Sequence, residues 1–273
     1  MNMKQTMTIG IISANRQDML ASLLRSLPML RDRCRVLIIE NSFEEGLEQE
    51  LRNAVEFLGK TGFDIACFQV PARQSMFKLR QQLLEECTTK YMWMLDDDVA
   101  LINDLNDPLR TFFDKVDRLS AGFGFIQGSK IDIRNTEGYD DWHISESSPQ
   151  KAPGDIPKWF YNYDCSWASD TCVMDCGNVF LNVKRALEVG GFKAPEALDK
   201  KGYTSEDVLL GARLASVYPC LFVSDLKVFH FPRQKMGFKT KDPRWLINAK
   251  EDLGISDKVK EQLNEFYKSK FGS

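Results

Sequence analysis

Short apolar runs alternate with helical patterns through about the first hundred residues, and this alternation restricts the possible fold more than any other feature. The apolar runs predict strands at residues 8–13, 35–40, 65–70 and 91–95. The stretches between them predict helices at residues 18–27, 44–58 and 76–87. Strands separated by helices at this spacing pair in parallel through right-handed crossovers. We therefore predict an α/β fold in which the first half of the sheet is parallel.

The second half of the chain is less regular. Its apolar runs predict strands at residues 121–127, 178–183, 220–223 and 227–230. Helices are predicted at residues 184–189, 206–216 and 256–268, the second of them capped by Ser205. Residues 132–170 show no clear period and contain Trp142, Trp159, Phe160, Tyr161, Tyr163 and Trp167. A loop of this length usually has a function, and aromatic faces suit sugars or bases, although packing of the loop against the sheet explains them equally well.

The composition is that of a soluble globular protein, with 43% hydrophobic and 27% charged residues in a chain of 273. A net charge of −3 argues against a general nucleic-acid binder, while a local basic patch stays open. The amino terminus does not have the pattern of a signal peptide, and no stretch approaches the roughly 18 apolar residues that span a membrane. We expect a cytoplasmic protein, with peripheral attachment to a membrane left open.

The seven cysteines do not form a metal-binding pattern. Cys165, Cys172 and Cys176 are close enough in sequence to suggest zinc, but no CxxC pair is present and the only histidines are His143 and His230. Reduced thiols in a cytosolic protein are the better interpretation.

Three consecutive aspartates, Asp96 to Asp98, close the apolar run 91–95. In open α/β sheets, ligands bind beyond the carboxyl ends of the strands. Carboxylates this close repel one another unless a positive charge offsets them. Oxygen ligands favour Mg²⁺ or Mn²⁺, so the cluster predicts a site for one of these cations. The alternative is a solvated acidic turn.

Four blocks of sequence carry a more specific pattern. They are Ile9-Gly10-Ile11-Ile12-Ser13-Ala14-Asn15-Arg16; Leu37-Ile38-Ile39-Glu40-Asn41-Ser42; Lys78-Leu79-Arg80-Gln81 with Leu95-Asp96-Asp97-Asp98; and Gly177-Asn178-Val179-Phe180-Leu181 with Gly190-Gly191-Phe192, Ser205-Glu206-Asp207-Val208 and His230. In their order and approximate spacing, from about Met7 to Arg233, they resemble family 2 glycosyltransferases. These enzymes have the GT-A fold and use nucleotide-sugar donors.

The resemblance implies that the first two blocks bind the nucleotide. Ser13, Asn15 and Arg16 fall in the opening strand and turn that touch it. Glu40 takes the place of the family's aspartate, which accepts a hydrogen bond from the nucleobase, commonly uracil. The glycine that follows in the family is missing here, which weakens the assignment of the base.

The third block is similar to the family's basic helix and acidic motif. Arg80 takes the basic position, and Gln81 replaces the usual asparagine. The resemblance implies that Asp96 faces the ribose and that Asp98 binds the metal. Asp97 is the variable middle position, which we group with the nucleotide contacts while its role stays open.

The fourth block implies the donor-sugar and acceptor side of the site. Gly177 falls in the loop beside the donor sugar, Glu206 and Asp207 match the family's Glu-Asp pair, and His230 falls where a histidine often completes the metal site. The acceptor hydroxyl needs a carboxylate to take its proton, and we assign this base to Asp207, with Glu206 orienting it or the acceptor. We expect the helix dipole to keep Asp207 ionised.

Each of these residues also has a structural interpretation. Glu206 and Asp207 could be ordinary residues of a first helical turn, and His230 could be a core histidine. Arg80 could cover a helix surface with its stem. The four blocks in the family's order favour the functional interpretation.

A basic stretch follows the histidine and comprises Arg233, Lys235, Lys239, Lys241 and Arg244. It is expected to close over the donor diphosphate. A second interpretation is contact with an anionic acceptor, such as a lipid phosphate or a nucleic acid, and a third is a solvated loop.

Together these observations predict a single GT-A domain over residues 1–273, with a mixed, mostly parallel sheet flanked by helices. Residues of about 1–100 form its nucleotide-binding half, and residues of about 101–273 its acceptor-binding half. The predicted activity is metal-dependent, inverting transfer of a sugar from a nucleoside diphosphate sugar, with a UDP-sugar favoured. The acceptor hydroxyl could belong to a saccharide, lipid carrier, protein, small molecule or modified nucleic-acid base.

Three other classes are weaker. A sugar nucleotidyltransferase would need a glycine-rich phosphate loop near the amino terminus, which is absent. An Asp-x-Asp phosphatase would need Thr or Val where this chain has Ala100. A nucleotide-sugar-binding protein without turnover would not need Glu206, Asp207 and His230 together.

Overall fold

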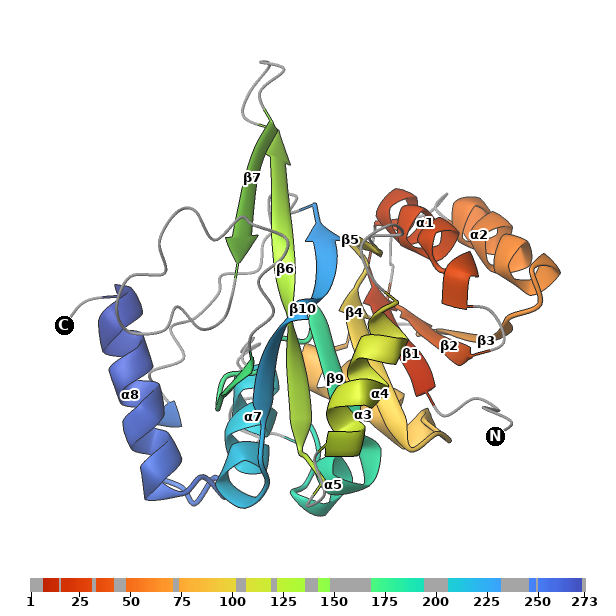
Figure 1. Cartoon of the computed structure of the whole chain (residues 1–273). Coiled ribbons are helices and arrows are strands. Elements are labelled where there is room, and N and C mark those ends of the chain that lie inside the picture. Colours follow the sequence, from red (N-terminus) through yellow and green to blue (C-terminus); the bar gives the residue numbers. More distant parts are fainter. Residues whose placement is uncertain are drawn as a thin grey trace.

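A mixed sheet flanked by helices forms the centre of the structure, a computed structural model (Figure 1). The described residues are 7–14, 16–30, 33–41, 48–70, 74–101, 107–118, 122–135, 142–147, 168–193, 206–231, 246–248 and 250–271. The strands are β1 (Met7–Ser13), β2 (Cys34–Glu40), β3 (Asp64–Gln69), β4 (Tyr91–Asp96), β5 (Val99–Leu101), β6 (Phe125–Asn135), β7 (Trp142–Ser147), β8 (Ala168–Asp170), β9 (Asn178–Asn182) and β10 (Leu221–His230). The helices are α1 (Gln17–Ser26), the 3-10 turn η1 (Pro28–Leu30), α2 (Glu48–Lys60), α3 (Met76–Glu86), α4 (Pro108–Arg118), α5 (Val183–Glu188), α7 (Glu206–Val217) and α8 (Asp257–Phe271).

The strand order is β3-β2-β1-β4-β9-β6-β10-β5, with β7 beside β6 and β8 beside β10. Strands β1, β2, β3, β4, β6 and β10 run in one direction, and β5, β7, β8 and β9 run in the other. The predicted mixed, mostly parallel α/β sheet is therefore confirmed. The order reverses between β1 and β4, which is where open α/β sheets bind their ligands.

Side chains of β4 alternate between the two faces of the sheet. Tyr91, Trp93 and Leu95 join a core cluster with residues of α1, α2 and α4. Met92 and Met94 join a second cluster, with residues of α3, α5 and α7. Helix α8 packs against α7 in a third cluster (Figure 1). Because β4 is buried on both faces, its polar end projects from a rigid part of the core.

Several elements of the second half differ from the prediction. The two strands expected at 220–223 and 227–230 are one strand, β10, with a register irregularity between Val223 and Lys227. The expected irregular stretch 132–170 contains the end of β6 and the strands β7 and β8. The predicted strand 121–127 starts later and is longer, because β6 continues as a hairpin with β7. Strand β5 and helix α4 were not predicted.

No helix in the described part of the chain is long and apolar enough to cross a membrane.

Asn178 connects the strands that support the site. It is fully buried, and its Oδ1 accepts a hydrogen bond of 2.9 Å from Trp93 Nε1 on β4. Its Nδ2 donates to the carbonyl oxygens of Ser129 at 2.8 Å and Leu226 at 2.7 Å. These carbonyls lie on β6 and on the irregular part of β10, so one amide holds three strands against β9.

We expect Asn178→Ala to lower the free energy of unfolding by about 3 kcal/mol, because it leaves the Trp93 donor and two carbonyls buried without partners. Urea denaturation measures this change. The control is Asn53→Ala on the exposed surface of α2, expected to change stability by less than about 0.5 kcal/mol. A loss as small as the control's would contradict the connecting role.

Candidate active site

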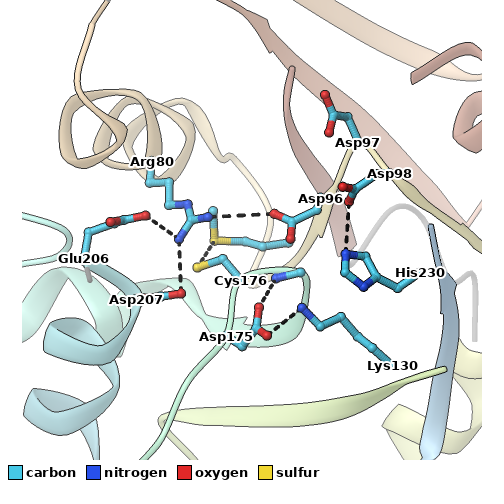
Figure 2. A network of polar contacts seen from close by, with 12 residues as sticks. Arg80, Asp96, Asp97, Asp98, Lys130, Asp175, Cys176, Glu206, Asp207 and His230 are labelled. Carbon is cyan, nitrogen blue, oxygen red and sulfur yellow. Dashed lines mark hydrogen bonds and ion pairs between the residues drawn. The ribbon is translucent and has the colours of Figure 1, made fainter. Parts of the chain in front are cut away.

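The site lies at one edge of the sheet, where the carboxyl ends of β4 and β10 meet. Strand β4 ends in Asp96 and strand β10 ends in His230. The backbone N–H of Phe231 donates to the carbonyl oxygen of Asp98 at 2.8 Å, which ties the two ends together. Asp175 and Cys176, shortly before the antiparallel strand β9, lie at the same edge (Figure 2).

Asp96, Asp98 and His230 form a candidate metal centre. One ligand atom from each lies within 4.8 Å of the others. Oδ1 of Asp98 is buried. Among the described residues it has one ion-pair partner, His230 Nε2, and the distance of 3.5 Å between the two atoms is long. Two carboxylates and an imidazole that converge in this way fit a divalent cation. The ribose contact implied for Asp96 stays a prediction, but its carboxylate also belongs to this centre.

The pKa of Asp98 lies below its usual range. Burial alone would raise it, but the contact with His230 and the charges of Arg16 and Lys130 outweigh burial. The carboxylate is therefore ionised at neutral pH, as a metal ligand must be.

Arg16 holds the other side of the aspartate cluster. Its Nη1 donates to Asp98 Oδ2 at 2.7 Å, while its Nε donates to Asp97 Oδ2 at 3.2 Å and its Nη2 contacts Asp97 Oδ1. Asp97 is fully buried and points away from His230 (Figure 2). Burial raises the pKa of Asp97 to about 7, against the opposing charge of Arg16. Asp97 thus anchors Arg16, whose side chain is 37% exposed.

Arg80 connects the candidate metal centre to helix α7. The guanidinium is buried, with Nη1 2.7 Å from Glu206 Oε1 and 3.6 Å from Asp207 Oδ2, and Nη2 3.8 Å from Asp96 Oδ1. Burial alone would lower the pKa of Arg80, but the surrounding acidic groups raise it above its usual value. Arg80 is therefore a permanent cation. Arg80 therefore lies among carboxylates from two elements instead of covering a helix surface (Figure 2).

Asp207 behaves differently from the expectation. Its Oδ1 accepts a hydrogen bond from its neighbour's N–H, that of Val208, at 2.8 Å, as the first turn of a helix allows. Burial and the adjacent Glu206 nevertheless raise its pKa to about 7, against the charge of Arg80. The expectation that the helix dipole keeps Asp207 ionised is wrong, because burial beside a second carboxylate outweighs it. A carboxyl that exchanges its proton near neutral pH is suited to general-base catalysis.

Lys130 and Asp175 also lie at the site, and neither was singled out from the sequence. Lys130 Nζ is 2.6 Å from Asp175 Oδ2, and Asp175 Oδ1 accepts a hydrogen bond of 2.8 Å from the N–H of Gly177. Burial alone would raise the pKa of Asp175, but the Lys130 ammonium holds it well below its usual range. Asp175 stands two residues before Gly177, and this proximity was the one feature of the sequence that could have assigned Asp175 to the site.

Gly177 is placed where a larger residue would displace the ends of neighbouring side chains. A Cβ there would lie 2.6 Å from Asp96 Oδ2 and 2.7 Å from Lys130 Nζ. The glycine thus lets an acidic and a basic side chain converge beside the candidate metal centre, which gives a physical reason for this residue in the loop.

The residues assigned to the nucleotide lie at the same edge, nearer β1 and β2. Ser13 and Glu40 end these strands, pair in register and are both buried. Gln17 Nε2 donates to Glu40 Oε1 at 3.1 Å. Asn15 lies outside the described residues, as do Ser205 and the basic stretch of residues 233–244. The nucleotide contacts of Ser13, Asn15, Arg16 and Glu40 stay predictions.

Gln81, which departs from the family's pattern, has a structural role. Its Oε1 accepts a hydrogen bond of 2.8 Å from the N–H of Phe192. The preceding Gly191 has φ +62, a left-handed conformation that favours glycine. Gln81 therefore fixes the Gly190-Gly191-Phe192 turn against α3.

The fold is the GT-A type found in nucleotide-sugar glycosyltransferases. Similar solved structures include S. aureus TarS 1-349 in complex with UDP-GlcNAc, with a TM-score of 0.64 and 12% identity over 97% of this chain and 73% of that one. Mannosyltransferase PcManGT from Pyrobaculum calidifontis, in complex with GDP-Man and Mn²⁺, has a TM-score of 0.58 and 12% identity over 85% and 58% of the two chains. GalNAc-T7 with UDP, GalNAc and Mn²⁺ has a TM-score of 0.58 and 15% identity over 96% and 54%.

The chain thus spans little more than half the length of PcManGT and of GalNAc-T7. No family model and no curated protein matches the sequence.

The raised pKa of Asp207 predicts how stability depends on pH. A folded state that binds this proton more tightly than the unfolded chain is stabilised at low pH, and this contribution is lost as pH rises through about 7. Asp207→Asn removes the titration. Relative to the unmodified protein, the variant should gain up to about 3 kcal/mol of unfolding free energy between pH 5 and pH 8.

Urea denaturation in EDTA at the two pH values measures this difference without interference from bound cations. Asn53→Ala on the exposed surface of α2 is the control; it removes no titrating group, so its difference from the unmodified protein should not depend on pH. A difference for Asp207→Asn that stays constant or falls with pH would contradict the raised pKa.

Proposed function

We propose that this protein is a metal-dependent glycosyltransferase that moves a sugar from a nucleoside diphosphate sugar to a hydroxyl acceptor. The observation that carries the proposal is that two groups of side chains, a candidate metal centre and a pair of carboxyl groups, are joined at one edge of the sheet. Asp96, Asp98 and His230 converge as a candidate metal centre, and Arg80 links Asp96 to Glu206 and Asp207. One group suits the donor diphosphate and the other the acceptor hydroxyl.

The contents of the similar structures support the choice of donor. The TarS structure contains UDP-GlcNAc, the PcManGT structure GDP-Man and Mn²⁺, and the GalNAc-T7 structure UDP, GalNAc and Mn²⁺. With the Glu40 block, which resembles a uracil-binding strand, this favours a UDP-sugar.

Asp96, Asp98 and His230 would hold Mn²⁺ or Mg²⁺, and the imidazole favours Mn²⁺ of the two. When bound, the cation supplies positive charge that stabilises the departing nucleoside diphosphate. Arg16, next to Asp98 and partly exposed, can add a second positive charge on the donor side.

Asp207 takes the proton of the acceptor hydroxyl as that oxygen attacks the donor sugar. Its pKa of about 7 lets it exchange this proton at neutral pH. Glu206 raises that pKa and holds Arg80, which in turn contacts Asp207. A single base is what an inverting displacement requires, so the proposed transfer inverts the anomeric centre, as in family 2 enzymes.

The donor site is tested by calorimetric titration of UDP, GDP and TDP, each with and without Mn²⁺. We expect micromolar binding of one nucleotide, UDP, that depends on Mn²⁺ and is lost in Asp98→Ala, because the variant removes a buried metal ligand. Asp114→Ala on α4 is the control and should bind as the unmodified protein does. A protein that binds none of the three nucleotides would contradict the proposed function.

The base is tested by Asp207→Asn. Removal of the general base should lower the rate of donor turnover by about 100-fold or more. The affinity for UDP and Mn²⁺ should change far less than the turnover rate does, because Asp207 lies outside the candidate metal centre. UDP release from UDP-sugars, with water or a panel of hydroxyl compounds as acceptor, measures the rate. In the unmodified protein this rate should rise with pH up to about 7. Equal losses of turnover and of UDP binding would refute the base assignment.

A further inference from the structure

Lys130 is a buried cation that none of the roles above uses. It lies on β6 with its side chain 10% exposed, and Nζ forms the 2.6 Å ion pair with Asp175. A buried ion pair adds little net stability, because desolvation of the two charges offsets their attraction. The position of this pair at the edge of the sheet, beside the candidate metal centre, therefore points to a ligand.

The geometry brings the ammonium close to the metal ligands. Lys130 Nζ and Asp96 Oδ2 approach Gly177 so closely that a Cβ there would be less than 3 Å from both. The charge of Lys130 also lowers the pKa of Asp98. An anionic group bound to a cation at Asp96 and Asp98 would thus lie next to the ammonium.

Asp175 holds the ammonium in this position. It is itself fixed from two sides, because its Oδ1 accepts from the N–H of Gly177 and its own N–H donates to Gln127 Oε1 at 2.8 Å. A lysine ammonium has three N–H donors, and the pair with Asp175 uses one. Lys130 can therefore donate to a ligand oxygen while Asp175 still orients it.

We propose that Lys130 is a donor-binding residue whose ammonium donates a hydrogen bond to the diphosphate of the nucleotide, and that Asp175 is its positioning residue. This role rests on the proposed function and adds to it a protein cation beside the metal. The alternative is that Lys130 only neutralises the surrounding carboxylates.

The two roles differ in their effect on the metal and on the nucleotide. Lys130 repels a divalent cation at Asp96 and Asp98, so its removal should leave Mn²⁺ binding unchanged or tighter in the absence of nucleotide. Removal of a contact with the diphosphate should instead weaken UDP binding. A residue that only neutralises carboxylates would, when removed, leave the ratio of UDP affinity to uridine affinity unchanged. A residue that only supports the local fold would, when removed, weaken Mn²⁺, UDP and uridine binding together.

The test is calorimetric titration of Lys130→Met and Lys130→Arg with Mn²⁺ alone, and with UDP and uridine in saturating Mn²⁺. For Lys130→Met we expect UDP affinity about 10- to 100-fold weaker, as for loss of a charged hydrogen bond, with uridine affinity unchanged. Lys130→Arg keeps the charge and should recover part of the UDP affinity. Lys184→Met on α5, whose side chain is 86% exposed, is the control and should bind normally.

Lys130→Met leaves Asp175 buried without its partner, so a second variant guards against misfolding. Lys130→Met/Asp175→Asn removes both charges, and it should fold and show the same selective loss of UDP affinity. UDP affinity within twofold of the unmodified protein, or parallel losses of UDP, uridine and Mn²⁺ affinity, would overturn the proposed role of Lys130 but not the proposed function. Absence of nucleotide binding in the unmodified protein would overturn the proposed function and this role with it.

Discussion

Mutual repulsion among carboxylates is the constraint on which this site depends. Asp96, Asp97, Asp98, Asp175, Glu206 and Asp207 gather at one edge of the sheet, and several of them are buried. Three cations divide this charge: Arg16 holds Asp97 and Asp98, Lys130 holds Asp175, and Arg80 holds Glu206 while also reaching Asp96 and Asp207. Among the described residues the carboxylates outnumber these cations, so this part of the edge keeps an excess of negative charge that suits a divalent metal.

The sequence predicted the elements that have strong periodic patterns. The alternation of the first hundred residues specified β1 to β4 and their helices, because parallel strands buried on both faces read as continuous apolar runs. The second half was harder, since its strands pair with distant partners. Strand β10 was divided in two because its irregular stretch, Ser224 to Leu226, interrupts the apolar pattern, and the Asn178 amide that supports this stretch lies far away in sequence.

The candidate site was predictable only where residues follow strand ends or open a helix. The three aspartates, the Glu206–Asp207 pair and His230 have such positions, and the structure brings them together. Lys130 lies inside a strand and gave no local signal. The pKa of Asp207 was misjudged for a related reason, because the dipole of a helix is visible in a sequence whereas burial beside Glu206 and Arg80 depends on the tertiary fold.

The reach of Arg80 to both Asp96 and Asp207 has a thermodynamic consequence. The proton affinity of Asp207 therefore depends on the charge at the end of β4, because the same guanidinium contacts both carboxylates. Under the proposed function, a divalent ion held by Asp96 and Asp98 would add positive charge on that side of Arg80 and would favour the ionised form of Asp207. One arginine would thereby link cation occupancy at the end of β4 to proton affinity at the start of α7.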